Sequence, residues 1–136
     1  MPRLEFSQVH SYRPKSEGIK LPVALRSGSA IADAVAHVDT GASHCLFERV
    51  LGDVLNLDIE TGEPKMFVTA AGRLDTLGHS VVIETFGMSF ESVVYFFADR
   101  RIQKNLLGRR GWLDRIRFDL VDHDQLLYLA PYDLGA

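Results

Sequence analysis

At 136 residues, of which 46% are hydrophobic and 24% charged, the chain has the length and composition of one globular domain with its own core. Its net charge of -3 gives no positive field to attract nucleic acid or an anionic membrane surface, so we expect neither as a partner. No apolar run reaches the roughly 18 residues of a membrane span, and the single cysteine, Cys45, cannot form an internal disulfide, so we expect a cytoplasmic protein.

The first part of the chain is divided by a loop. Residues 3–10 alternate in part between apolar and polar and are compatible with a strand, whereas residues 11–18 contain Pro14 and Gly18 and predict a loop. We therefore expect an N-terminal segment over residues 1–18 and a single domain over residues 19–136.

The clearest strand pattern comes next. Apolar residues occupy every second position over residues 19–25, and the turn sequence Arg-Ser-Gly-Ser then leads into a run of small and β-branched residues over 30–38. This pattern predicts a hairpin whose second strand ends at Asp39. A carboxylate at the end of a buried strand is costly unless it is hydrogen-bonded or paired, so Asp39 is the first candidate functional residue.

The middle of the chain predicts one helix and two hairpins. Apolar residues with 3, 4, 7 spacing over residues 46–57 predict a short amphipathic helix interrupted at Gly52, and residues 60–64 predict a loop. Residues 66–69 and 74–76 predict strands joined by a tip of small residues. The β-rich runs 79–86 and 90–98 are expected to pair around the turn that contains Gly87.

The last third predicts short strands around a close crossing. Leu106 and Leu107 end a strand, and Gly108 allows that strand to pass close to other backbone. Residues 112–115 have room for one helical turn, and residues 116–121 and 126–130 predict two strands joined by a turn.

The order of these motifs resembles the retropepsin-like aspartic proteases. The resemblance is carried by the Asp-Thr-Gly-Ala-Ser turn at residues 39–43, by the hairpin with a glycine at its tip, and by Leu-Leu-Gly at residues 106–108 before a helical turn. It covers residues 19–130, and its layout is most similar to the Ddi1-like eukaryotic branch. The resemblance implies a mainly β fold: a closed acid-protease-type β-barrel with one or two short helices and a flap hairpin.

The chemistry of such an enzyme requires two carboxylates, one as base and one as acid. The chain has one Asp-Thr-Gly, at Asp39, Thr40 and Gly41, and the sequence Asp75-Thr76-Leu77 lacks the glycine of that motif. The second carboxylate must then come from Asp39 of a second copy, so we expect a homodimer that is most active at acid pH and acts on extended peptides. The resemblance implies that Thr40 hydrogen-bonds across the pair and that the Gly41 carbonyl accepts a substrate N–H. It implies no metal and no cofactor.

The resemblance also implies contacts with substrate. In the implied arrangement the flap tip is formed by Ala71, Gly72 and Arg73. The pockets beside the scissile bond are bordered by His37 and Leu106, and the pockets further out are bordered by Ser43 and His44. His37 departs from the family, which usually has an apolar residue there. Ser43 replaces an aspartate that holds an arginine in retroviral members, which leaves the role of Arg109 open.

Other functions remain open on the sequence alone. The fold can serve as a non-catalytic module for dimerisation or peptide binding, although the intact Asp-Thr-Gly favours an enzyme. A metal-dependent hydrolase can be built on His37, Asp39 and His44, but the sequence shows no clear fourth ligand. Cys45 can be a thiol nucleophile, but a lone cysteine before Leu-Phe is more often a small buried residue.

The remaining conspicuous residues favour structural roles. We expect the arginine pairs at residues 100–101 and 109–110 to be solvated charges, with contacts to substrate or to a second subunit as the alternative. We expect Trp112 to anchor the core.

Overall fold

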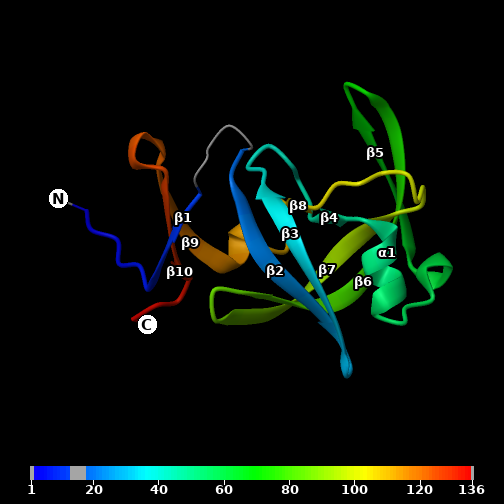
Figure 1. Cartoon of the computed structure of the whole chain (residues 1–136), viewed down its shortest axis with the longest axis horizontal. Helices are drawn as coiled ribbons and strands as arrows, with labels where there is room; N and C mark the ends of the chain where they lie inside the picture. Colours follow the sequence, from blue (N-terminus) through cyan, green and yellow to red (C-terminus); the bar gives the residue numbers. More distant parts are fainter. Residues whose placement is uncertain (1, 13–17, 136) are drawn as a thin grey trace.

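The protein is mainly β in the computed structural model, which describes residues 2–12 and 18–135 (Figure 1). The strands are β1 (Gln8–Ser11), β2 (Lys20–Ser27), β3 (Ala30–Val38), β4 (Leu46–Phe47), β5 (Glu63–Thr69), β6 (Gly72–Thr85), β7 (Met88–Phe97), β8 (Leu106–Leu107), β9 (Ile116–Val121) and β10 (Leu126–Pro131). The helical elements are α1 (Arg49–Val54), η2 (Ile59–Thr61), η3 (Leu113–Arg115) and η4 (Asp122–Asp124). None of the helices in the described ranges has the length and apolarity needed to cross a bilayer.

Six strands join into a closed ring. They follow the order β2, β3, β8, β4, β7 and β6. The ring closes because the last strand, β6, pairs with the first, β2, through residues 82–84 and 24–26. Strand β5 pairs with β6 at the end of this order and stands outside the ring. Closure directs apolar side chains from all sides into one interior, where Leu25, Ile83 and Phe96 are fully buried.

A separate three-stranded sheet carries both ends of the described chain. Its order is β1, β10, β9, and the first and last described segments lie on its side of the molecule in Figure 1. The predicted loop over residues 11–18 begins one residue late, because Ser11 belongs to β1; residues 13–17 of that loop lie outside the described residues. Tyr12 is buried in the main core, which ties this sheet to the ring. The division of the chain at residue 18 stays a prediction.

The predicted hairpin before Asp39 is confirmed. Strands β2 and β3 pair antiparallel from Lys20 with His37 to Ser27 with Ala30, which is the whole length of β2. The two-residue turn between them contains Gly28 at a φ of 57°, a left-handed conformation that glycine adopts without steric cost.

The predicted helix over residues 46–57 is too long. Leu46 and Phe47 form β4, which pairs with β7 and β8, and helix α1 begins only at Arg49. Both β4 residues are buried, so their apolar character reflects a central strand and not a helix face. Gly52 does not interrupt the helix. A Cβ at Gly52 would lie 2.7 Å from the Ile59 side chain, so the glycine makes room for that residue.

One long strand serves both predicted hairpins of the middle region. The expected strands 74–76 and 79–86 belong to β6, except that Phe86 lies in the turn after Thr85; β6 pairs with β5 at its start and with β7 along most of its length. The expected loop 60–64 is shorter than predicted, because η2 ends at residue 61 and β5 begins at Glu63. The tip of the β5–β6 hairpin lies at residues 70–71 and projects away from the ring (Figure 1).

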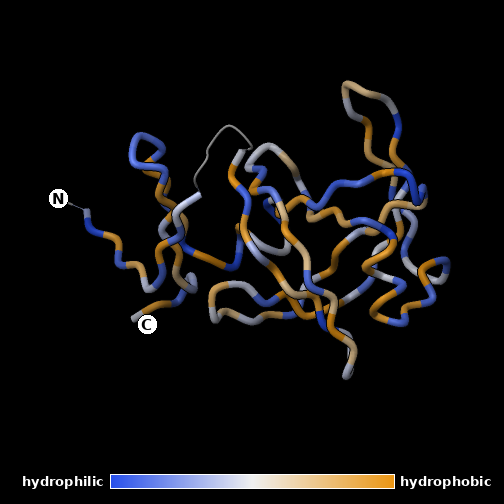
Figure 2. Tube along the Cα trace, viewed as in Figure 1, coloured by the Kyte–Doolittle hydropathy of each residue, from blue (hydrophilic) through white to orange (hydrophobic). Residues whose placement is uncertain are grey.

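The elements of the last third agree with the sequence. The strands β8, β9 and β10, the helical turn η3 and the turn at residues 122–125 lie where the pattern predicts them. Trp112, the expected core anchor, is fully buried. Figure 2 shows that segment 99–105 and the turn at 122–125 are mostly hydrophilic, whereas hydrophobic residues follow the strands of the ring.

Candidate active site

Asp39 lies where β3 ends, and backbone groups hold its position. Its N–H donates to the Leu107 carbonyl of β8 (3.0 Å), which extends the parallel pairing of β3 and β8 by one residue. Its carbonyl accepts the N–H of Ala42 (3.1 Å), and its Oδ1 accepts the N–H of Gly41 (3.0 Å). The half-buried carboxylate therefore has a backbone donor that compensates for lost water.

The chain after β8 crosses the Asp39 turn at close range. The two residues that follow Gly108 donate their N–H groups to the carbonyls of Ala42 and Ser43, each at 2.9 Å. A Cβ on Gly108 would lie 2.2 Å from the His44 carbonyl oxygen, so the crossing has no room for a side chain. The close backbone approach predicted at Gly108 is confirmed.

A cavity of about 370 Å³ opens beside the Asp39 carboxylate. Three parts of the fold line it: the turn after β3, the end of β5, and the short strands β4 and β8. Asp39 supplies the acid among these lining residues, which are Asp39, Gly41, Ala42, Ser43, His44, Leu46, Phe67, Val68, Thr69 and Leu106.

The structure brings together only part of the predicted site. Leu106, Ser43 and His44 line the cavity with Asp39 and Gly41. Thr40 is exposed at the apex of the same turn.

The predicted flap tip and His37 lie elsewhere in the single chain. Ala71, Gly72 and Arg73 are exposed at the end of the β5–β6 hairpin and do not line the cavity, and Arg73 forms an ion pair with Asp75 (3.0 Å). His37 also lies outside the cavity lining. It is half-buried, and its ring would be 3.3 Å from a Cβ at Gly18. The substrate contacts of these four residues stay predictions.

Sequence reasoning missed the contributions of β4 and β5. The helical pattern around Leu46 conceals a strand residue that lines the cavity. Along β5, Lys65 and Phe67 are half-buried while Met66 and Val68 are exposed. This alternation with period two was the available signal that Phe67 points inward.

Two residues of the cavity lining, His44 and Phe67, belong to a cluster of three aromatic rings. His44, Phe67 and Tyr95 contact one another edge to face, with ring centroids 5.3 to 5.7 Å apart. Burial lowers the pKa of His44, and the positive charges of Lys65 and Arg110 lower it further. His44 is therefore neutral at neutral pH, and its Nδ1 lies 2.8 Å from the Ser43 hydroxyl.

The metal-site alternative has no cluster to build on in the described ranges. Within them, no three histidine, cysteine or acidic side chains gather closely enough to hold a metal ion. His37 and His44 are not brought together with Asp39 in one cavity, since His37 is absent from the lining.

Cys45 is a buried structural residue. Its side chain is fully buried, its Sγ accepts the N–H of Gly108 (3.4 Å), and burial raises the pKa of its thiol to about 12. Since the thiolate is the reactive form, the structure disfavours a thiol nucleophile at this position.

We expect Cys45 to resist alkylation in the folded protein. Because the thiol pKa is raised well above its usual value, the thiolate is scarce at pH 8, and burial excludes the reagent as well. Incubation with iodoacetamide followed by mass measurement should give unmodified protein under native conditions and one adduct in denaturant. Fast native alkylation would contradict this burial.

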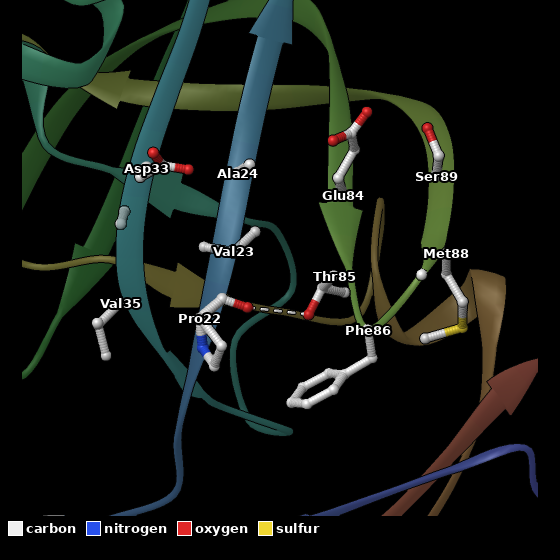
Figure 3. Close-up of a pocket in the computed structure, with 12 residues that line it drawn as sticks. Pro22, Val23, Ala24, Asp33, Val35, Glu84, Thr85, Phe86, Met88 and Ser89 are labelled. Atoms are coloured by element: carbon white, nitrogen blue, oxygen red, sulfur yellow. Dashed lines mark hydrogen bonds between the residues drawn. The ribbon is translucent and has the colours of Figure 1, made fainter.

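A larger hollow lies outside the candidate site. It measures about 850 Å³ and opens between β2, β3 and the β6–β7 turn, where Figure 3 shows the Thr85 hydroxyl bonded to the Pro22 carbonyl (3.0 Å). Its acids are Asp33 and Glu84, and Glu84 is paired with Arg26 (2.6 Å). No residue of the predicted site lines it, so size alone does not mark the site here.

The fold is that of the retropepsin-like aspartic proteases. The chain is similar to a retropepsin-like aspartic protease from Rickettsia conorii, with a TM-score of 0.65 and 18% identity over 89% of this chain and 96% of that chain. It is also similar to the EIAV protease complexed with the inhibitor HBY-793, with a TM-score of 0.52 and 17% identity over 66% of this chain and 80% of that chain. No family model and no curated protein matches the sequence. The fold class implied by the Asp-Thr-Gly turn and its surroundings is thereby confirmed.

Proposed function

We propose that the protein is an aspartic endopeptidase that hydrolyses extended peptides with two Asp39 carboxylates, one from each subunit of a homodimer. The observation that carries this proposal is the backbone-held Asp39 beside a cavity in which it is the acid among the lining residues. One carboxylate cannot act as base and acid in the same step, whereas two that share a proton can. A two-fold axis beside Asp39 supplies the second, because such an axis sets each residue opposite its own copy.

The proposed reaction passes protons through both carboxyl groups and breaks the C–N bond of the peptide. The ionised Asp39 takes a proton from a water molecule while the water oxygen attacks the carbonyl carbon of the scissile bond. The partner subunit's Asp39, protonated at the start, gives its proton to the carbonyl oxygen. Asp39 then gives the proton it took from water to the amide nitrogen, while the partner subunit's Asp39 takes a proton from a hydroxyl of the tetrahedral intermediate. The C–N bond breaks, a carboxylic acid and an amine leave, and one of the two carboxyl groups is again protonated. Since one of the two carboxylates must be protonated, activity should be greatest at acid pH.

The neighbouring residues receive supporting roles in this proposal. Thr40, exposed at the turn, is available to hydrogen-bond across the subunit boundary, and the Gly41 carbonyl is available to a substrate N–H. Leu106 and the Ser43–His44 end of the cavity contact substrate side chains. The β5–β6 hairpin acts as a flap that moves over the substrate and excludes water, which brings its tip to the site in the assembled complex. His37, on β3, borders a pocket beside the scissile bond in that complex.

Two finer assignments complete the proposal. Helix α1 between the Asp39 turn and the hairpin, together with the β9–β10 hairpin, supports a layout like that of the Ddi1-like branch. The single buried cysteine supports a reducing compartment such as the cytoplasm.

Solution mass tests the shared site. We expect the protein to reach twice its 15.2 kDa chain mass, and a peptide that mimics the tetrahedral intermediate to shift the equilibrium further toward the dimer, because such a peptide contacts both subunits. Light scattering over a concentration series, with and without the peptide, provides the measurement.

Two outcomes would separate this proposal from its alternatives. A protein that stays monomeric at high concentration with the peptide present cannot use a shared pair of carboxylates. A dimer that binds peptides but cleaves none would be a binding module with the same fold.

A further inference from the structure

A second pocket adjoins the Asp39 cavity and is lined by two arginines. It has a volume of about 370 Å³ and shares Ser43 with the cavity; its other lining residues are Arg109, Arg110, Leu113 and Asp114. Across the part of the chain that the structure describes, neither guanidinium has a hydrogen bond or an ion pair. The other arginine pair differs, since Arg100 contacts Asp53 and Arg101 contacts Asp99.

The backbone places these two cations relative to the candidate site. Both N–H groups donate to the Asp39 turn, Arg109 to the Ala42 carbonyl and Arg110 to the Ser43 carbonyl, each at 2.9 Å. The side chains themselves are exposed and make none of these contacts. A change confined to the guanidinium groups therefore leaves the crossing intact.

The positive charge extends into the neighbouring cavity. Lys65, on the inward face of β5, and Arg110 both lower the pKa of His44. The acid in the arginine pocket, Asp114, is already engaged: its Oδ1 accepts the N–H of Gly111 (3.0 Å) and lies 3.7 Å from the Arg115 guanidinium. Arg109, Arg110 and Lys65 thus place three positive charges near the Ser43 end of the cavity, although the whole chain carries a net charge of -3.

We propose that the pocket of Arg109 and Arg110 selects substrates that carry an acidic side chain, Glu or Asp, several residues from the scissile bond. The inference rests on the proposed function, because it assumes that an extended peptide lies in the Asp39 cavity and continues past Ser43. A guanidinium can donate two parallel hydrogen bonds to the carboxylate of a Glu or Asp side chain. The side-chain amide of Gln or Asn carries no negative charge and has only one oxygen to accept such bonds, so it binds a guanidinium less tightly. The two arginines would then be residues that determine specificity and take no part in the hydrolysis.

Paired peptides test this selection. We would use extended apolar peptides that differ only by Glu or Gln at one position, with that position scanned on both sides of the scissile bond. At one position we expect the Glu peptide to have a kcat/KM about tenfold higher than the Gln peptide. In Arg109→Gln with Arg110→Gln, this preference should disappear while the Gln peptide is cleaved at its former rate. The wild-type preference should also weaken as salt is added.

The control variant is Arg101→Gln, which removes the same charge from an arginine already paired with Asp99; it should keep the preference. Cleavage of both peptides at equal rates at every position would overturn the inference and leave the proposed function intact.

If no peptide is cleaved, fluorescence anisotropy with the labelled Glu and Gln peptides decides the question. Tighter binding of the Glu peptide that is lost in the double variant supports the pocket, and equal binding overturns it.

Discussion

Replacement of Asp39 by Asn is expected to lower kcat/KM for peptide hydrolysis by about a thousandfold or more, because the amide can neither take a proton from water nor share one with its copy. The change is nearly isosteric, and the amide oxygen of the new side chain would still accept the Gly41 N–H, so the turn should keep its shape. A peptidase assay at acid pH with a melting curve for each protein gives the measurement.

Mixed dimers make this test more stringent. If each site needs both copies of Asp39, a dimer of one wild-type and one Asp39→Asn chain has a single carboxylate and is inactive. After equal amounts of the two chains exchange subunits at random, about one quarter of the dimers retain both carboxylates. Activity should fall to about one quarter of that of undiluted wild-type protein at the same total concentration. A fall to one half would mean that each chain acts alone, and the shared-site mechanism would be wrong.

The parts of the fold that the sequence predicts well are those with local signals. The hairpin before Asp39 has a period of two and a glycine turn, and Gly108 marks a crossing that no other residue fits. These two features define the Asp39 turn and the strand beside it. The candidate catalytic carboxylate was therefore accessible from sequence, together with the strand that supports it.

The parts that the sequence predicts poorly depend on distant partners. Leu46 and Phe47 are followed by helical spacing, and only their pairing with Tyr95 and Phe96 of β7, far along the chain, makes them a strand. Likewise, Phe67 enters the cavity because its ring meets His44 and Tyr95. Tertiary contacts of this kind leave at most a weak alternation in the local sequence.

The two arginine pairs show that the sequence also does not reveal which charged side chains find a partner in the fold. In the sequence, residues 100–101 and 109–110 are both arginine pairs and predict solvated charges alike. In the structure, the first pair forms ion pairs with Asp53 and Asp99. The backbone of the second pair is bonded to the Asp39 turn, and within the described residues neither of its guanidinium groups forms an ion pair. The difference lies in what each pair meets in space, which composition does not reveal.

Replacement of Gly108 by Ala is expected to be among the most destabilising single changes in this protein. The added Cβ would lie 2.2 Å from the carbonyl oxygen of His44 and 2.8 Å from that of Ala42. Both are backbone atoms of the Asp39 turn, so neither can rotate away, and the two chain segments must separate. We expect a loss of about 3 kcal/mol or more in the free energy of unfolding and a fall in Tm of roughly 10 °C.

A second glycine separates this clash from the general effect of adding a methyl group. At Gly28 a Cβ meets no atom within 4 Å, but the φ of 57° disfavours other residues, so Gly28→Ala should cost about 1 kcal/mol. Chemical denaturation of both variants compares the two costs. The crossing also positions the candidate carboxylate, so any folded Gly108→Ala protein should lose peptidase activity beyond its loss of stability, whereas Gly28→Ala should keep it. Equal costs for the two variants would show that the turn yields easily, and that Asp39 is held less firmly than its hydrogen bonds indicate.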